Sequence, residues 1–261
     1  MNNVNKTLYI PLYGKAYVSK RGLFLQDPKA EQIWEAEGFP LKGKAKSKWL
    51  AYYMGMRSAV FDRWTERQLE VNPEAVVLHL GCGMDSRVLR VKNPGAAWFD
   101  VDFPEVIEER RRYFADAEGY TMIPSDVRDL GWLDAVPKGG HGIVVLEGIS
   151  MYLQPETLKA VLQAIRSHFD RVHILMDSYT VFAAKATKYK NPINEVGVTQ
   201  VYGMDDPRDL EETGIQLVAE RELTPEDMIQ QLKGLEETVF RKLYAGNMAK
   251  KLYRMYEFTE A

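Results

Sequence analysis

The pattern of hydrophobic and polar positions changes near residue 71 of the chain. Before that point the pattern is helical and irregular, and apolar residues recur at helical spacing from Trp49 to Leu69. Beyond it, short apolar runs predict buried strands separated by helical segments. These strands are expected at residues 75–80, 96–101, 120–124, 142–147 and 172–176.

Helices are predicted between these strands. Pro104 and Pro155 each stand where a helix should begin, since proline is favoured at the first helical position. Alternation of strands and helices at this spacing indicates βαβ units, a parallel sheet and right-handed crossovers. Ligands bind such sheets at the carboxyl ends of the strands, which directs attention to the glycine turn at 81–83.

The C-terminal part has a looser pattern. Residues 185–201 are rich in lysine and asparagine and suggest a lid or insertion. We expect a strand at 215–221, one continuous helix over 224–244 and a final edge strand at 252–258. The chain is therefore predicted to be a single domain with a helical N-terminal cap (1–70), a ligand-binding core (71–178), a lid (179–214) and closing strands and helix (215–261).

Composition excludes several classes of protein. The formal net charge of -3 gives no basic field for nucleic acid. Cys82 is the single cysteine, so neither an internal disulfide nor a multi-cysteine zinc cluster can form. His141, His168 and His173 show no metal-ligand spacing, His79 in its apolar strand suits a core position, and no metal is expected. No apolar run is long enough for a membrane span, and a reducing cytoplasm is the default location.

The glycine turn and a downstream acid suggest a nucleoside site. Gly81 and Gly83 let the backbone approach a ligand closely. A dinucleotide fingerprint needs a third glycine where Ser86 stands, so a Rossmann oxidoreductase is disfavoured. Asp102, about 20 residues on, is placed to accept hydrogen bonds from ribose hydroxyls. S-adenosylmethionine offers a nucleoside without a diphosphate; the alternative role for Asp102 is an N-cap before Phe103-Pro104.

Several segments together resemble the leucine carboxyl methyltransferase family, and within it the bacterial branch of polyketide O-methyltransferases. They are HLGCGMDSR (79–87), WFDVDFPEVI (98–107), SDVRDL (125–130), LEGISMYL (146–153) and YGMDDPR (202–208). The resemblance implies an α/β class I methyltransferase fold, Rossmann-like, with a seven-stranded, mostly parallel sheet and one reversed strand. It also implies S-adenosylmethionine as methyl donor.

The implied reaction is methyl transfer to a carboxylate or hydroxyl oxygen of a small, polyketide-like molecule. Methylation of a protein C-terminal carboxyl group and donor binding without catalysis are the alternatives. The sequence gives no indication of oligomeric state. Neither the first 45 residues nor segment 183–200 carries a family match, so the acceptor stays unidentified.

The resemblance also implies roles for residues of the donor site. Arg57 would bind the methionine carboxylate of the donor, for which a planar guanidinium is suited. Gly81, in the turn with Gly83, would border the donor's methionine part, and Asp102 would hold the ribose. Glu147 would lie near the charged end of the donor, where a carboxylate suits an ammonium group.

Four further residues are implied around the adenine and the acceptor. Asp126 and the backbone of Val127 would flank the adenine, while Arg128 and Tyr152 would face the acceptor. Structural alternatives remain for three of the candidates. Arg57 could pair with Asp62 or Glu66 on its own helix, Arg128 could form a local ion pair with Asp126 or Asp129, and Tyr152 could cover the core.

Overall fold

The computed structural model describes residues 8–38, 43–91, 95–186 and 200–261. Seven strands form one sheet in the order β3-β2-β1-β4-β5-β7-β6. Neighbouring strands from β3 to β5 run parallel, whereas β7 is antiparallel to both β5 and β6. The strands are β1 (Val76–Leu80), β2 (Ala97–Asp102), β3 (Tyr120–Pro124), β4 (His141–Leu146), β5 (Arg171–Tyr179), β6 (Ile215–Arg221) and β7 (Tyr253–Glu260). The predicted seven-stranded sheet with one reversed strand is confirmed.

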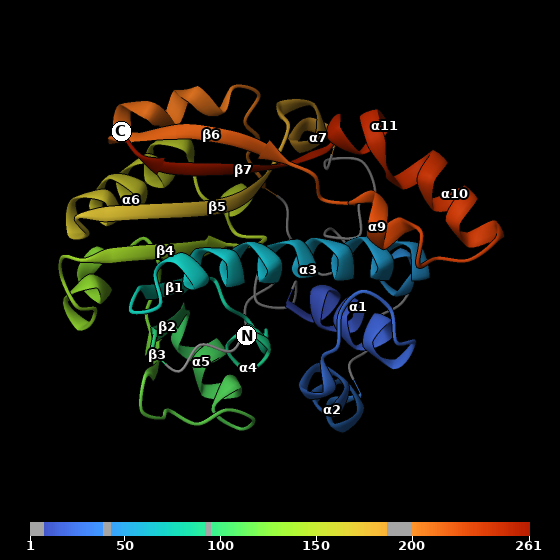
Figure 1. Cartoon of the computed structure of the whole chain (residues 1–261), viewed down its shortest axis with the longest axis horizontal. Helices are drawn as coiled ribbons and strands as arrows, with labels where there is room; N and C mark the ends of the chain where they lie inside the picture. Colours follow the sequence, from blue (N-terminus) through green and yellow to red (C-terminus); the bar gives the residue numbers. More distant parts are fainter. Residues whose placement is uncertain (1–7, 39–42, 92–94, 187–199) are drawn as a thin grey trace.

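Helices precede, connect and follow these strands (Figure 1). Their bounds are α1 (Tyr9–Lys20), α2 (Pro28–Glu37), α3 (Lys48–Val71), α4 (Arg87–Arg90), α5 (Pro104–Arg110), α6 (Pro155–His168), α7 (Val181–Ala186), α9 (Glu226–Ile229), α10 (Leu235–Tyr244) and α11 (Gly246–Lys250). The predicted starts at Pro104 and Pro155 are confirmed, and α3 matches the helical spacing seen from Trp49 to Leu69.

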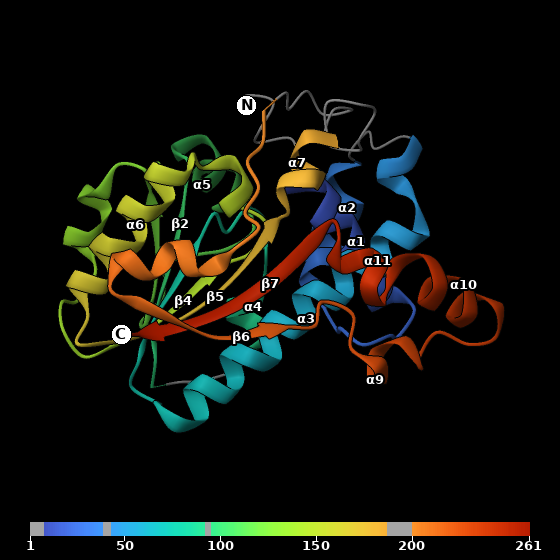
Figure 2. The same cartoon turned by 90° about the horizontal axis from the view of Figure 1, so that it is seen from above.

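The sheet has a hydrophobic core on each face. Alternate residues of a strand point to opposite faces, so Leu78 of β1 packs in the core that contains α6, while Val77 packs in the core that contains α3. Figure 2 shows the sheet between α6 and α3. Burial on both faces explains why these strands appear in the sequence as apolar runs.

The first strand lies at the point where the strand order reverses. β2 lies on one side of β1 and β4 on the other, and the connections leave in opposite directions. A crevice forms at the carboxyl ends of strands at such a point. The loops that follow β1, β2, β3 and β4 therefore meet at one edge of the sheet (Figure 1).

Two expectations for the C-terminal part are wrong. The last strand is not at the edge, because β7 pairs with β5 on one side and β6 on the other. Its buried residues, such as Met255 and Phe258, suit an interior position. The single helix over 224–244 is broken into α9 and α10, with Gly234 at a φ of 61° before α10.

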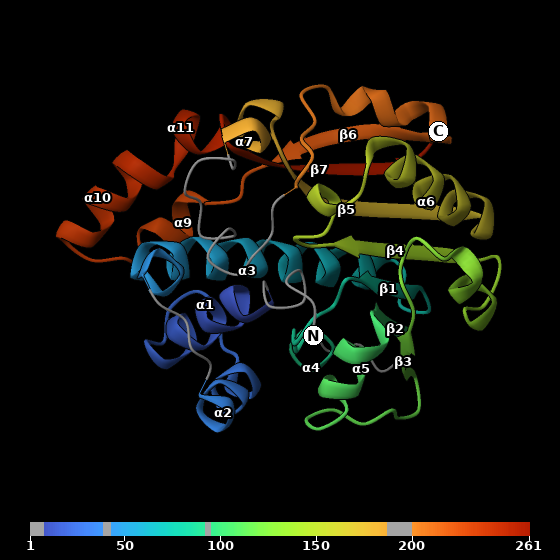
Figure 3. The same ribbon diagram turned by 180° about the vertical axis from the view of Figure 1, so that it is seen from behind.

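Helices α9, α10 and α11 thus form an insertion between β6 and β7. Figure 3 shows this insertion and the helix pair α1 and α2 on opposite sides of the first half of α3. Most of the lid expected at 185–201 lies outside the described residues. Among the helices that the structure describes, none combines the length and apolar character needed to cross a bilayer.

Candidate active site

A cavity of about 650 Å³ opens at the carboxyl ends of the strands. Ligand sites of α/β sheets are expected at this edge, and pockets of this size hold small molecules. All nine site residues predicted from the sequence line it: Arg57, Gly81, Gly83, Asp102, Asp126, Val127, Arg128, Glu147 and Tyr152. The fold thus brings together residues that lie up to 95 positions apart in the chain (Arg57 to Tyr152). Their roles toward a ligand stay predictions.

The turn after β1 depends on its two glycines. Gly81 has a φ of 65° and Gly83 a φ of 51°, a region that side chains disfavour. A Cβ on Gly81 would also lie 2.7 Å from Cδ1 of Ile149. The turn therefore requires glycine at position 81 for both backbone conformation and space.

Asp102 fixes this turn against the end of β2. Its Oδ2 accepts the backbone N–H of Gly83 at 2.7 Å, and its Oδ1 accepts that of Phe103 at 2.8 Å. No side chain caps the N-terminus of α5. The alternative N-cap role for Asp102 is therefore wrong, and its carboxylate borders the cavity instead.

Burial shifts the acidity of Asp102. Loss of hydration raises the pKa of its carboxyl group to about 6, although the N–H groups of Gly83 and Phe103 and the charge of Arg110 act to lower it. The group is ionised at pH 7 and above. It can then accept further hydrogen bonds, because each carboxylate oxygen has more than one acceptor site.

Arg57 joins three elements at the opposite wall. From α3 its Nε and Nη2 reach Oε1 of Glu147 at 3.1 and 3.0 Å. Its Nη1 donates to the Tyr253 hydroxyl at 3.1 Å and lies 3.5 Å from Oδ2 of Asp177. The alternative pairing of Arg57 with its own helix is wrong, since Asp62 pairs with Arg87 and Arg90.

The carboxyl groups beside Arg57 differ in acidity. Burial alone would raise the pKa of Glu147, but Arg87 and then Arg57 bring it down to about 2. Asp177 is also buried, and desolvation raises its pKa to about 6 despite the nearby charge of Arg57. Glu147 is therefore a permanent anion of the cavity wall at physiological pH.

Sequence reasoning missed a second buried ion pair on the wall. Lys15 of α1 and Asp85, which follows the glycine turn, both line the cavity, and Nζ of Lys15 lies 3.0 Å from Oδ2 of Asp85. Only 3% of Lys15 is exposed, which is rare for a lysine. The cavity thus has two fixed charge pairs, each with a cation and an anion.

The adenine and acceptor candidates lie after β3 and β4. Arg128 forms the local ion pair with Asp126, its Nε at 2.9 Å from both carboxylate oxygens, so that alternative is confirmed. Asp129 instead accepts the N–H of Gly131. Tyr152 packs against the core, as its structural alternative expects, and also lines the cavity, while its role toward the acceptor stays a prediction.

The rest of the cavity wall is mainly apolar. Much of it comes from the helical N-terminal part, the loop after β4, the end of β5, the α9–α11 insertion and the start of β7. The residues from these parts are Leu8, Ile10, Pro11, Leu12, Leu50, Tyr53, Met54, Ile149, Met151, Leu153, Tyr179, Leu243, Tyr244, Ala249, Leu252 and Tyr253. Further apolar residues lie in the turn after β1 and at the start of α5: Cys82, Met84, Phe103 and Val106. One cavity thus has a charged region at the sheet and an apolar region under the added helices.

The fold is shared with a solved methyltransferase. Magnesium protoporphyrin IX methyltransferase from Synechocystis PCC 6803 superposes with a TM-score of 0.52 over 95% of this chain and 97% of that chain, at 14% identity. The fold is thus that of a class I methyltransferase, as expected.

Sequence comparison defines the family. The profile described as "Leucine carboxyl methyltransferase" matches residues 7–166. The tetracenomycin polyketide synthesis O-methyltransferase TcmP of Streptomyces glaucescens is 32% identical over 81% of this chain and 79% of its own length. The S-adenosyl-L-methionine-dependent methyltransferase dpfgK of Gibberella zeae is 32% identical over 64% of this chain and 61% of its own length.

The chain belongs to the leucine carboxyl methyltransferase family. It is accordingly an S-adenosylmethionine-dependent methyltransferase, and the Rossmann oxidoreductase alternative is excluded.

Proposed function

We propose that the enzyme transfers a methyl group from S-adenosylmethionine to an oxygen atom of a small, largely apolar acceptor of polyketide-like character. The observation that carries the proposal is one cavity that has both a charged region at the sheet and an apolar, aromatic region beneath α1, α3 and the α9–α11 insertion. The donor carries charged groups and the proposed acceptor is largely apolar. Methyl transfer requires the two molecules together in one enclosed space. The polyketide relative TcmP supports an acceptor of this kind.

The charged region fits the donor. Asp102 borders the turn where a ribose would lie, with a carboxylate that can accept its two hydroxyl groups. Asp126 and Val127 lie beyond it, at the end of β3, where the adenine would follow. Arg57 and Lys15 would face the donor's carboxylate, and Glu147 and Asp85 its ammonium group. The two buried ion pairs thereby match the two charges of an amino acid.

The reaction mainly requires the protein to position the donor and the acceptor. The donor is a sulfonium with its positive charge already in place, and the methyl group moves by in-line displacement to the acceptor oxygen. Holding two reactants in line can lower a barrier by as much as about 7–11 kcal/mol. The apolar wall excludes water from the line of transfer, and Arg128 and Tyr152 would face the acceptor.

A carboxylate acceptor suits the cavity better than a phenol. His79 is the one histidine of the chain on the cavity wall as described. Its ring is buried, with Nε2 3.2 Å from Arg87 and Nδ1 3.3 Å from Asp100. It is held below the donor region and is not placed to accept a proton from the acceptor. A carboxylic acid, with a pKa of about 4, needs no base at pH 7, whereas a phenol near 10 does.

The test is a transfer assay with labelled S-adenosylmethionine and a panel of aromatic carboxylic acids, phenols and a peptide with a C-terminal leucine. We expect methyl esters of small acids, formed at saturating S-adenosylmethionine at a rate that is flat from pH 6 to 9. A rate that rises over this range would indicate a phenol or alcohol acceptor. Methylation of the peptide alone would contradict the small-molecule proposal, and donor binding without transfer to any acceptor would indicate a non-catalytic protein.

A further inference from the structure

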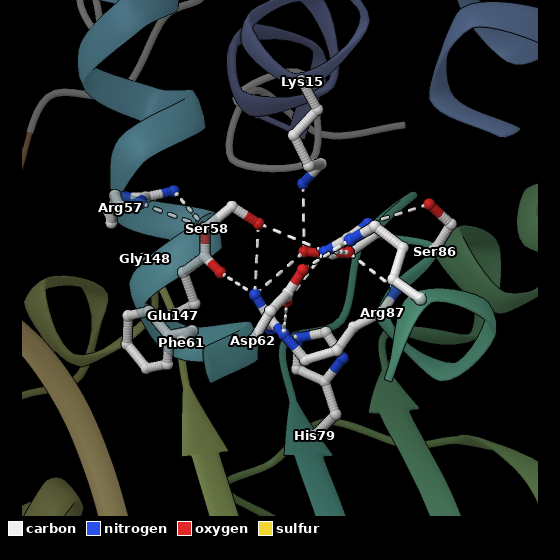
Figure 4. Close-up of polar contacts among 12 residues, drawn as sticks. Lys15, Arg57, Ser58, Phe61, Asp62, His79, Ser86, Arg87, Glu147 and Gly148 are labelled. Carbon is white, nitrogen blue, oxygen red and sulfur yellow. Dashed lines mark hydrogen bonds and ion pairs between the residues drawn. The ribbon is translucent and has the colours of Figure 1, made fainter. Parts of the chain in front are cut away.

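Arg87 lies at the centre of the buried charges below the cavity (Figure 4). It is the first residue of α4, and its side chain is fully buried. It does not line the cavity, whereas Glu147, His79 and Asp85 around it do. Any influence of Arg87 on a ligand must therefore pass through these neighbours.

The guanidinium group of Arg87 contacts residues from several elements. Its Nε donates to Oδ1 of Asp62 at 2.6 Å, and its Nη2 donates to Oε2 of Glu147 and, at 3.2 Å, to the hydroxyl of Ser58. Its Nη1 lies 3.2 Å from Nε2 of His79. The planar fork thus connects α3, the end of β4 and β1 in one fixed arrangement.

Three further contacts fix the position of Arg87 itself. Its backbone N–H donates to Oδ1 of Asp85 at 2.9 Å, and its Nη2 lies 3.5 Å from Oδ2 of the same residue. The guanidinium carbon lies 5.4 Å from the ring centroid of Phe61. With a ring on one side and carboxylates around it, the group has little freedom to turn.

Glu147 is held between two arginines. One carboxylate oxygen accepts from Arg87, below the cavity, and the other from Arg57, on its wall. Contacts at both oxygens restrict rotation of the carboxylate, and loss of Arg87 would remove one of the two. The orientation of Glu147, and through it the contact between Glu147 and Arg57, therefore depends on Arg87.

We propose that Arg87 is a positioning residue for the donor site. Arg87 holds Glu147 in the orientation that the amino-acid end of the methyl donor requires. The inference rests on the proposed function, because Glu147 and Arg57 are the groups expected to bind that end. Arg87 itself makes no contact with the donor. Its role is to keep an anion and a cation of the wall aligned before the donor binds.

The charges around Glu147 predict how loss of Arg87 would change donor binding. Arg57 of α3, Lys15 of α1 and Arg87 act to lower the pKa of Glu147, while burial and Asp85 act to raise it. Asp177 of β5 and Tyr253 of β7 reach the same region through Arg57. Removal of Arg87 takes away the largest lowering influence, so the pKa of Glu147 rises. Binding that depends on its charge then weakens in acid.

The experiment is calorimetric titration with S-adenosylhomocysteine of the wild type, Arg87→Lys, Arg87→Gln and Arg90→Gln from pH 5.5 to 8.5. We expect both Arg87 variants to raise the Kd at least tenfold at pH 8. Arg87→Gln, which also removes the positive charge, should in addition lose more affinity in acid than the wild type does. Arg90 shares Asp62 and Asp85 with Arg87 but does not contact Glu147. Its variant is the matched control and should bind within about threefold of the wild type.

A double-mutant cycle with Glu147→Gln separates positioning from general damage. We expect Glu147→Gln to weaken binding by itself and Arg87→Gln to have no further effect in that background. Full additivity, or wild-type affinity in both Arg87 variants, would overturn the inference. If Arg87→Gln does not fold, Arg87→Lys decides, because it keeps the charge and loses the fork. Failure of the wild type itself to bind S-adenosylhomocysteine would instead reject the proposed function.

Discussion

The carboxylate of Asp102 accepts the backbone N–H of Gly83 at 2.7 Å, which joins the end of β2 to the turn after β1. The two residues are 19 positions apart in the chain and both line the cavity. This contact makes Asp102 a structural link, and we expect the same carboxylate to accept hydrogen bonds from a ribose in that corner.

Replacement of Asp102 by alanine should weaken binding of S-adenosylhomocysteine at least tenfold without unfolding the protein. The loss follows because charge-assisted hydrogen bonds contribute about 1.5–3 kcal/mol each. Calorimetric titration measures the Kd, and circular dichroism checks the fold. Asp134→Ala, at an exposed position away from the cavity, is the control for loss of one negative charge. An unchanged Kd for Asp102→Ala would remove this residue from the site.

Donor binding should depend on pH through Asp102. Its pKa is raised to about 6 by burial, so the carboxyl group is ionised above that pH and gains a proton below it. Protonation removes acceptor capacity, and affinity for S-adenosylhomocysteine should be flat from pH 7 to 8.5 and fall below pH 6. The fall should persist in Asp177→Asn, although Asp177 has a similar pKa. If the fall in affinity below pH 6 is equally large in Asp102→Asn, a group other than Asp102 titrates.

Ionisation of Asp102 affects folding stability and donor binding in opposite directions, because it favours binding but disfavours the folded state. A folded-state pKa above the unfolded value of 3.8 means that Asp102 favours the folded state below pH 3.8, and that this contribution is lost as the pH rises through 6. Asp102→Asn should therefore show its largest gain in unfolding free energy, relative to the wild type, above pH 6. A gain confined to acid would contradict the raised pKa. Urea titrations at pH 5 and pH 8 make the comparison.

Gly81→Ala should be more destabilising than Gly140→Ala. Both glycines have a φ near 65°, but a Cβ at 81 would meet Ile149 at 2.7 Å, whereas nothing lies within 4 Å of one at 140. The backbone term is about 1–3 kcal/mol in both, and the steric term adds about 1–3 kcal/mol at 81. Chemical unfolding of the two variants measures the difference, and equal losses would show that Ile149 moves freely away.

Tyr244 should affect the acceptor and not the donor. Its ring stacks on Trp49 at a centroid distance of 5.9 Å and an angle of 11°, and it lines the apolar region of the cavity. Tyr244→Ala should raise the KM for the best acceptor of the panel about tenfold and leave the Kd of S-adenosylhomocysteine within twofold. Leu235→Ala, at an exposed position on the same helix, is the control. An equal loss of donor affinity would place Tyr244 beside the donor and contradict its assignment to the acceptor region.

The sequence predicted the parallel core well because its strands are buried on both faces and appear as apolar runs. The place of β7 within the sheet could not be predicted from apolar runs. Periodicity indicates which residues form a strand, but it does not indicate which strands pair with one another. The break before α10 has a local cause, the positive φ of Gly234, but a glycine within a helical pattern is often tolerated.

The candidate site was predictable where motifs follow strands in order. Gly81, Asp102 and Glu147 each come at the carboxyl end of a strand, so one rule for parallel sheets brings them together. Lys15 and Arg87 carry no such signal. Lys15 reaches the cavity from a helix 70 residues before its partner Asp85, and its burial follows only from how α1 packs on α3.

The most direct measurement is a crystal structure of the protein soaked with S-adenosylhomocysteine. The account predicts the ribose hydroxyls at Asp102, the adenine beside Asp126 and Val127, and the amino-acid end between Arg57 and Glu147. Density for the ligand elsewhere, or a cavity closed by side chains at saturating ligand, would contradict it.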